Sequence, residues 1–218
     1  MKLYYSDVLM PRKACAVAQY LRSPVDYIYL DLIKGEHKTA DYLALNPNGK
    51  VPTLVDGDRA FWESDVIMCH LSDRAGADLW PHDDRQLEVL RWLSWAAQHY
   101  ARCGGALYFE GVIKARFGIG EPDASVVDEE IAHFRRFSAV LDAHLDGRTW
   151  LVGDRLSVAD FAVAVALPYA EPAHMPLAEF LHVARWHDRL SELPAWREPF
   201  PQRATTSARA VPMPAAAQ

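Results

Sequence analysis

The stretch that decides the fold runs from Asn46 to Leu54, NPNGKVPTL, and is followed nine positions later by Glu63-Ser64. Asn-Pro-Asn-Gly is typical of a tight turn, and Val51-Pro52 then leads directly into a short apolar strand. Because proline cannot donate a hydrogen bond to a sheet, Pro52 needs a special role at this place. A cis Val51-Pro52 bond would turn the N–H and C=O of Val51 outward, where they could pair with an extended peptide.

The Glu63-Ser64 pair is expected where the next strand ends and a helix begins. Ser64 is a favourable residue at a helix N-terminus. The free N–H groups and the dipole of such a terminus attract a carboxylate. Together with the turn before it, the pair predicts a socket for a small peptide that carries a free carboxylate.

The segments around this socket follow the order strand, helix, strand, hairpin, helix. Strand-forming runs cover residues 2–6 and 25–31, and apolar residues at helical spacing predict a helix over 12–21 between them. Such a unit is expected to be parallel and right-handed. Asp56-Gly57 predicts a hairpin turn between two further strands, and a helix over 64–74 closes the unit. The order βαβ followed by ββα is that of a thioredoxin-like domain.

From about residue 76 the sequence changes to linker composition and then to helical periodicity. We therefore expect an α/β domain at residues 1–77, an all-α domain at 86–202, and a mobile tail, rich in Ala and Pro, at 203–218. The helices predicted in the second domain cover residues 86–117 with an interruption near Gly104-Gly105, 125–145, 158–167 and 176–190.

Composition argues against several classes of function. The chain has 218 residues, half of them hydrophobic, and a formal net charge of −6, which provides no basic surface for nucleic acid. It has no apolar run of 18 residues and no cleavable leader, so we expect a soluble cytoplasmic protein that does not enter a membrane. Cys15, Cys69 and Cys103 show neither a CxxC motif nor metal-ligand spacing, so no metal site is expected. Cys15 and Cys69 are expected to pack in the core.

The Val-Pro turn before a strand and the Glu-Ser pair at a helix start resemble the amino-terminal domain of the cytosolic glutathione transferase superfamily. The run DLIKGEHK, residues 31–38, and the later KVPTLVDGD are most similar to the pattern of the theta class. The chain therefore resembles a bacterial theta-like or beta-like member of the superfamily. GDRLSVADFAVA, residues 153–164, resembles a motif of the family's helical domain, and its Ser157-Val158-Ala159-Asp160 is a variant of the capping box. The resemblance covers roughly residues 1–200.

The resemblance implies glutathione as co-substrate and a set of binding residues. Val51 would pair its backbone with the cysteinyl part, Glu63 and Ser64 would hold the γ-glutamyl end, and Lys50 and His37 would approach the glycine carboxylate. Each has a purely structural alternative: a surface loop position for His37, a turn cap for Lys50, and a plain helix start for Glu63-Ser64. The implied glutathione-binding residues are His37, Lys50, Val51, Pro52, Glu63 and Ser64.

The chemistry implied by the resemblance is activation of the glutathione thiol. A free thiol has a pKa of about 8.5, and lowering it by about 2 units requires roughly 2.7 kcal/mol of preferential stabilisation of the anion. A hydroxyl together with a helix N-terminus can supply an energy of this order. The theta-type serine aligns with Leu9 and the beta-type cysteine with Met10, and neither side chain can donate a useful hydrogen bond.

Three other residues are candidates for thiol activation. Tyr5 ends the first strand, Ser6 follows it with a hydroxyl, and Arg12 at the start of the first helix could stabilise a thiolate by its charge. Each also has a structural interpretation, as a half-buried strand aromatic, a turn residue and a solvated first-turn arginine respectively.

The electrophile is expected in the cleft between the domains, lined by the long helix after the linker and with Leu9 and Met10 among its residues. On that helix a polar and aromatic stripe at helical spacing could form the opposite wall, or could instead serve helix packing or a subunit contact. The stripe consists of Trp95, His99, Arg102 and Cys103.

We therefore expect a homodimeric glutathione transferase for detoxification, which uses bound thiolate to attack small apolar electrophiles. Two alternatives remain open. One is a glutathione-dependent reductase, peroxidase, dehalogenase or isomerase of the same fold. The other is a non-catalytic glutathione-binding scaffold, because Leu9 and Met10 stand where the usual catalytic serine or cysteine would be.

Overall fold

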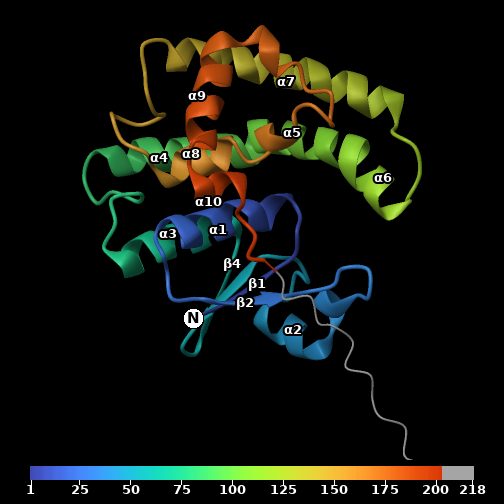
Figure 1. Cartoon of the computed structure of the whole chain (residues 1–218), viewed down its shortest axis with the longest axis vertical. Helices are drawn as coiled ribbons and strands as arrows, with labels where there is room; N and C mark the ends of the chain where they lie inside the picture. The colour runs from blue at the N-terminus through green and yellow to red at the C-terminus, as the bar shows by residue number, and fades with distance from the viewer. Residues whose placement is uncertain (203–218) are drawn as a thin grey trace, which may run out of the picture.

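The computed structural model describes residues 1–202. A small sheet with its helices forms one part of the molecule, and a larger helical layer covers one side of it (Figure 1). Within these residues no helix is long and apolar enough to cross a membrane. The tail expected to be mobile, residues 203–218, lies outside the described residues.

The N-terminal domain is built on a four-stranded mixed sheet in the order β2-β1-β3-β4. β1 runs parallel to β2 and antiparallel to β3, and β3 pairs antiparallel with β4. The predicted thioredoxin-like order is therefore confirmed, although the short helices η1 and α2 were not predicted. The elements are β1 (Lys2–Tyr5), α1 (Leu9–Tyr20), β2 (Asp26–Tyr29), η1 (Glu36–Lys38), α2 (Ala40–Leu45), β3 (Thr53–Asp56), β4 (Arg59–Trp62) and α3 (Ser64–Ala75).

Helix α1 begins at Leu9, three residues before the predicted start. Pro11 stands in its first turn, where the missing N–H would have had no partner within the helix. The early start brings Leu9 and Met10 into the first turn. Figure 1 shows α1 and α3 between the sheet and the helical layer, with α2 on the far side of the sheet. The core between these layers is apolar and includes Leu3, Leu54, Val17, Ile67 and Leu71.

The helical domain contains the predicted long helix, but its interruptions differ from the prediction. Two π-helical turns, η2 and η3, divide it, whereas Gly104-Gly105 lies inside a regular helix. Gly104 is required there by close packing, because a Cβ atom at this position would lie 2.6 Å from Cβ of Ala166. The elements are α4 (Arg85–Trp95), η2 (Ala96–Tyr100), α5 (Ala101–Tyr108), η3 (Phe109–Ile113), α6 (Lys114–Phe117), α7 (Ala124–Leu145), α8 (Val158–Val163), η4 (Leu167–Tyr169), η5 (Leu177–Glu179), α9 (Leu181–Ser191) and α10 (Pro194–Arg197).

The centre of the helical domain is organised by Asp160, which is fully buried in the first turn of α8. Its carboxylate accepts hydrogen bonds from the backbone N–H of Ser157 at 2.9 Å, the backbone N–H of Leu151 at 3.0 Å and the indole N–H of Trp186 at 2.9 Å. The predicted capping box is thus present, and the same carboxylate also joins α8 to α9. The helix is shorter than the predicted 158–167.

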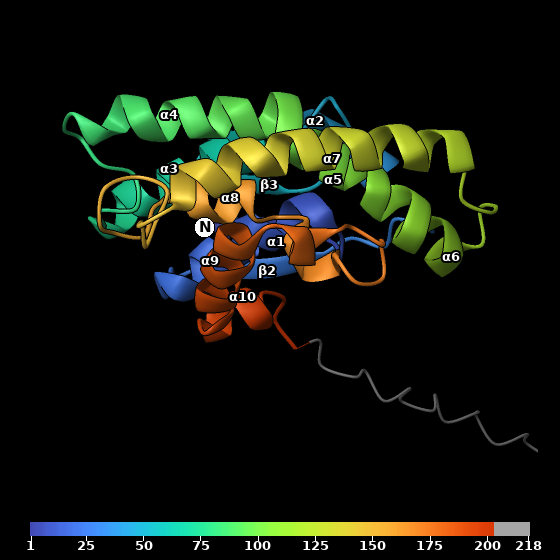
Figure 2. The same ribbon diagram turned by 90° about the horizontal axis from the view of Figure 1, so that it is seen from above.

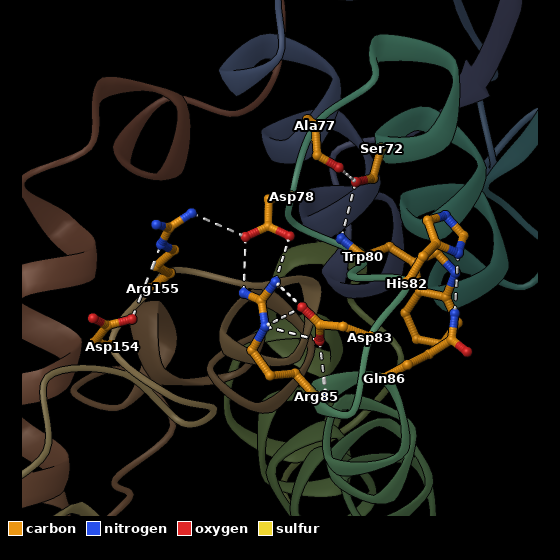
Figure 3. Close-up of polar contacts among 10 residues, drawn as sticks. All are labelled: Ser72, Ala77, Asp78, Trp80, His82, Asp83, Arg85, Gln86, Asp154 and Arg155. Atoms are coloured by element: carbon orange, nitrogen blue, oxygen red, sulfur yellow. Dashed lines mark hydrogen bonds and ion pairs between the residues drawn. The ribbon is translucent and has the colours of Figure 1, made fainter.

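The segment between the domains is held by an exposed polar network (Figure 3). Arg85 at the start of α4 pairs with Asp78 at 2.7 Å and with Asp83 at 2.6 Å. On the other side the Ser72 hydroxyl, within α3, both donates to and accepts from the backbone of the linker. α3 ends at Ala75 and α4 begins at Arg85, and the domain limits 77 and 86 stay predictions.

Candidate functional site

A cleft of about 970 Å³ lies between the two domains. Its floor is formed by the start of α1, the loop after β2 and the turn that precedes β3. The opposite wall comes from α5, η3 and α6, and it is strongly apolar. The side chains of this wall include Tyr108, Phe109, Ile113, Phe117 and Ile119.

One end of the cleft is polar and basic, with His37, Lys38 and Lys50 among its lining residues. Burial and the neighbouring Lys38 lower the pKa of His37, which favours its neutral imidazole, so the positive charge at this end comes from the two lysines. The backbone at Lys50 is fixed from behind, because its carbonyl accepts hydrogen bonds from the Tyr42 hydroxyl at 2.6 Å and from the Asn46 amide at 2.8 Å. This end of the cleft can therefore hold an anionic group at a defined position.

Val51 follows this turn, lines the cleft and is joined to Pro52 by a cis peptide bond, as predicted. The adjacent Gly49 has a φ of +57°, and a Cβ there would lie 2.8 Å from Nζ of Lys38. Glycine adopts this positive φ without strain, which is the main reason for its presence here, since the Lys38 side chain could move away from a Cβ atom. The NPNG turn thus sets the direction in which Val51 meets the cleft.

The predicted Glu63-Ser64 pair adjoins the same region at the start of α3. Trp62 pairs with Thr53 across β3 and β4, so residues 63 and 64 lie beside the Val51-Pro52 turn. Ser64 is 5% exposed, whereas Glu63 is exposed and has a φ of +68°. A positive φ is unfavourable for glutamate, so the backbone at Glu63 is strained. Neither residue is among those that line the cleft itself.

The first turn of α1 opens on the cleft through Val8, Leu9 and Met10. Val8 is the N-cap in an extended conformation, and its side chain makes no capping hydrogen bond. The first N–H groups of a helix have no partner within the helix, so this terminus offers donors and a partial positive charge to a ligand. Leu9 and Met10 lie in the cleft as predicted.

The three predicted thiol activators, Tyr5, Ser6 and Arg12, are not among the described residues that line the cleft. Tyr5 is buried against Tyr27, Tyr29 and Phe200, with ring centroids 5.6–6.0 Å apart. Ser6 is 3% exposed, and among the described residues it is not part of the cleft lining.

Arg12 lies outside the cleft lining because it contacts the end of the helical domain. Its guanidinium donates a hydrogen bond to the backbone carbonyl of Trp196, 184 residues further along the chain. It lines a second pocket and not the cleft. A partner so distant in sequence could not be predicted from the local pattern.

The predicted stripe on the long helix faces α7 of the same helical domain and does not form the cleft wall. Trp95 and His99 contact the ring of Phe137 on α7, and Arg102 pairs with Glu130 at 3.6 Å. Cys103 is fully buried, and burial raises the pKa of its thiol to about 12. Of the interpretations given for this stripe from the sequence, the structure shows packing against another helix.

The residues that do form the wall lie further along the same predicted helix. Gly105, Phe109, Ile113 and Phe117 follow one another at four-residue intervals, and Tyr108 lies beside them. The helical-spacing argument, applied to this stretch, would have found them.

The fold and the cleft define a two-domain protein of the kind that binds glutathione in its thioredoxin-like domain. The family model "Glutathione S-transferase, N-terminal domain" matches residues 10–74, and "Glutathione S-transferase, C-terminal domain" matches residues 94–194. "Glutathione S-transferase 3" of Zea mays is 32% identical over 179 residues, 79% of this chain and 80% of that protein. "Probable glutathione S-transferase GSTF2" of Oryza sativa subsp. japonica is 32% identical over 201 residues, 89% and 93% of the two chains.

The solved structure of glutathione S-transferase-I bound with lactoylglutathione superimposes with a TM-score of 0.83 at 26% identity, covering 91% of this chain and 97% of that one. The chain belongs to the glutathione S-transferase superfamily, as the resemblance implied. The bacterial theta-like or beta-like subclass is not confirmed, since the relatives named above are plant glutathione S-transferases.

Proposed function

We propose that this protein is a glutathione transferase whose bound thiolate attacks small apolar electrophiles. The observation that carries the proposal is the composition of the cleft. A basic, hydrogen-bonding end at His37, Lys38 and Lys50 continues into an apolar wall that includes Phe109 and Phe117. Such a cleft suits a charged peptide at one end and an apolar acceptor at the other.

Glutathione would lie across the floor of the cleft. Its cysteinyl backbone would pair with Val51 as an added strand, and its glycine carboxylate would meet Lys50 and His37. The γ-glutamyl end would reach Glu63 and Ser64, where the N-terminus of α3 favours its carboxylate. This pose is supported by the position of α3 beside the Val51-Pro52 turn.

Thiol activation would come from the first turn of α1 and from Tyr108. The α1 terminus faces the cleft, and Tyr108 carries the one side-chain hydroxyl among the described lining residues. Burial raises the pKa of Tyr108 to about 12, so the phenol stays protonated and can donate a hydrogen bond to a thiolate. The thiolate sulfur then forms a bond to the electrophilic carbon. The bond between that carbon and the leaving group breaks, and the leaving group keeps its electron pair.

A non-catalytic glutathione-binding scaffold remains the second candidate, favoured by Leu9 and Met10 in the first turn of α1. Glutathione-dependent reduction, peroxidase, dehalogenase or isomerase chemistry would use the same thiolate on a different acceptor. A homodimer in the cytoplasm is part of the proposal. It is supported by apolar side chains exposed along α4 and α7, namely Leu87, Leu90 and Val140.

The test is a pH titration of the thiolate ultraviolet absorbance of glutathione in the presence of the protein. We expect the pKa of the bound thiol to lie about 1–2 units below the free value of about 8.5. Tyr108→Phe should raise the pKa of the bound thiol, and Tyr20→Phe, a control at an exposed position on α1, should not. Met10→Ser should increase turnover if the first turn lacks a donor. Saturable binding with an unshifted pKa would instead support the scaffold.

A further inference from the structure

A second pocket, of about 500 Å³, is formed where the start of α1, the end of α6 and the chain after α10 meet. We call it the arginine pocket after Arg12, Arg116 and Arg197, which line it. Within residues 1–202 it shares no lining residue with the cleft. Figure 1 shows α10 lying against α1 in this part of the molecule.

Arg12 is the deepest of the three and is only 7% exposed. Its guanidinium donates to the carbonyl of Trp196 at 2.5 Å and lies over the rings of Tyr169 and Trp196, at 5.6 and 5.0 Å from their centroids. Its buried Nε has no hydrogen-bond partner, and within residues 1–202 no carboxylate forms an ion pair with it. A buried charge ordinarily has a counter-charge, so this guanidinium can accept an anion.

The other two arginines are also held by backbone carbonyls. Arg116 donates to the carbonyl of Asp7 at 2.6 Å, and its contact with the Asp7 carboxylate is long, at 4.0 Å. Arg197 donates to the carbonyls of Ser191 and Glu192 at the end of α9. These bonds fix the guanidinium groups while using only some of their five donors.

The charge and shape of the pocket restrict the ligand. Two carboxylates, Asp7 and Glu198, also line it, so among the described lining residues the three arginines leave one positive charge in excess. His187, near the buried arginine, is neutral at pH 7, because burial lowers its pKa to about 4. The rings of Tyr169 and Phe200 add apolar surface. A monoanion with a flat apolar body matches these features.

We propose that the arginine pocket binds a small organic carboxylate, with its carboxylate at Arg12 and its apolar body against Tyr169 and Phe200. A guanidinium and a carboxylate fit each other through parallel N–H···O bonds. The pocket adjoins the cleft where Tyr108 contacts Tyr169, with ring centroids 4.5 Å apart, but carboxylate binding here does not require the activity proposed above.

The test uses isothermal titration calorimetry of the full-length protein with benzoate, and with benzamide as its uncharged counterpart. We expect saturable binding of one benzoate per chain and at least about tenfold weaker binding of benzamide. Arg12→Gln should weaken benzoate binding by about tenfold or more. Arg116→Gln changes an exposed side chain and should weaken benzoate binding several-fold. If Arg12→Gln does not fold, the benzoate affinity of Arg116→Gln tests the proposal in its place.

Lys50→Gln is the matched control, since it removes a cation from the cleft and leaves the arginine pocket intact. Its benzoate affinity should equal that of the unaltered protein. Three results would overturn the proposal: no saturable benzoate binding, equal binding of benzoate and benzamide, or a loss caused by Lys50→Gln and not by the arginine variants. The last result would place benzoate in the cleft and leave the glutathione proposal untouched.

Discussion

At the scale of single residues, Ser64 is the sharpest test of the proposed glutathione pose. Its position at the N-terminus of α3 suits a bound carboxylate, and it is buried enough for a lost hydrogen bond to matter. We predict that Ser64→Ala weakens glutathione binding by about 1–3 kcal/mol, measured by calorimetry. Ser125→Ala, near the start of α7, is the matched control and should change nothing. Unaltered affinity in Ser64→Ala would remove this residue from the site.

The residues that sequence placed correctly are those fixed by local patterns. His37, Lys50 and Val51 meet in the cleft, because the NPNG turn and the short η1 helix position them within one segment of the chain. Local patterns also made Tyr5 and Arg12 candidates for the site. In the structure the ring of Tyr5 stacks on Phe200, and Arg12 donates to the carbonyl of Trp196, both from the end of the helical domain. Contacts between residues so far apart in the chain are absent from any local pattern.

At the scale of elements, the capping box of α8 was readable from Ser157 and Asp160, but the bonds of its carboxylate to Leu151 and Trp186 were not. Similarly, the apolar period of residues 86–117 predicted a long helix without showing its π turns. A π turn inserts a residue and rotates all later side chains around the helix. The first π turn lies inside the predicted cleft stripe, between Trp95 and Arg102, so the regular spacing assumed for the stripe does not hold. Trp95 itself precedes the turn and packs against Phe137 on α7.

The buried carboxylate of Asp160 leads to a prediction about stability. Asp160→Asn removes the charge that three N–H donors share and places an amide N–H₂ against at least one of them. We expect the free energy of unfolding to fall by about 3 kcal/mol, measured by urea denaturation. Asp154→Asn, six residues earlier in the same motif, alters a side chain that is 96% exposed and should have little effect. Equal losses in the two variants would contradict this role for Asp160.

At the scale of the whole molecule, the arrangement of the two domains follows from apolar surfaces that each domain leaves for the other. α1 and α3 are covered by the sheet on one side and by α8 and α10 on the other (Figure 1). The sequence predicted both domains from their periodicities. It could not predict which residues face across the junction, because that depends on how two separately folded surfaces fit.

Apolar side chains are exposed on α4 and α7, two helices that meet where Trp92 contacts His144. Figure 2 shows both helices at the same edge of the molecule. Leu87 and Leu90 on α4 are 74% and 50% exposed, and a second copy of the chain would remove them from water. We predict a dimer in light scattering after size exclusion, with about twice the 24.6 kDa of one chain. Leu90→Glu should shift the protein to monomers by placing a charge in the interface. Leu181→Glu, at an equally exposed position on α9, should remain dimeric. A dimer that survives Leu90→Glu would place the interface elsewhere.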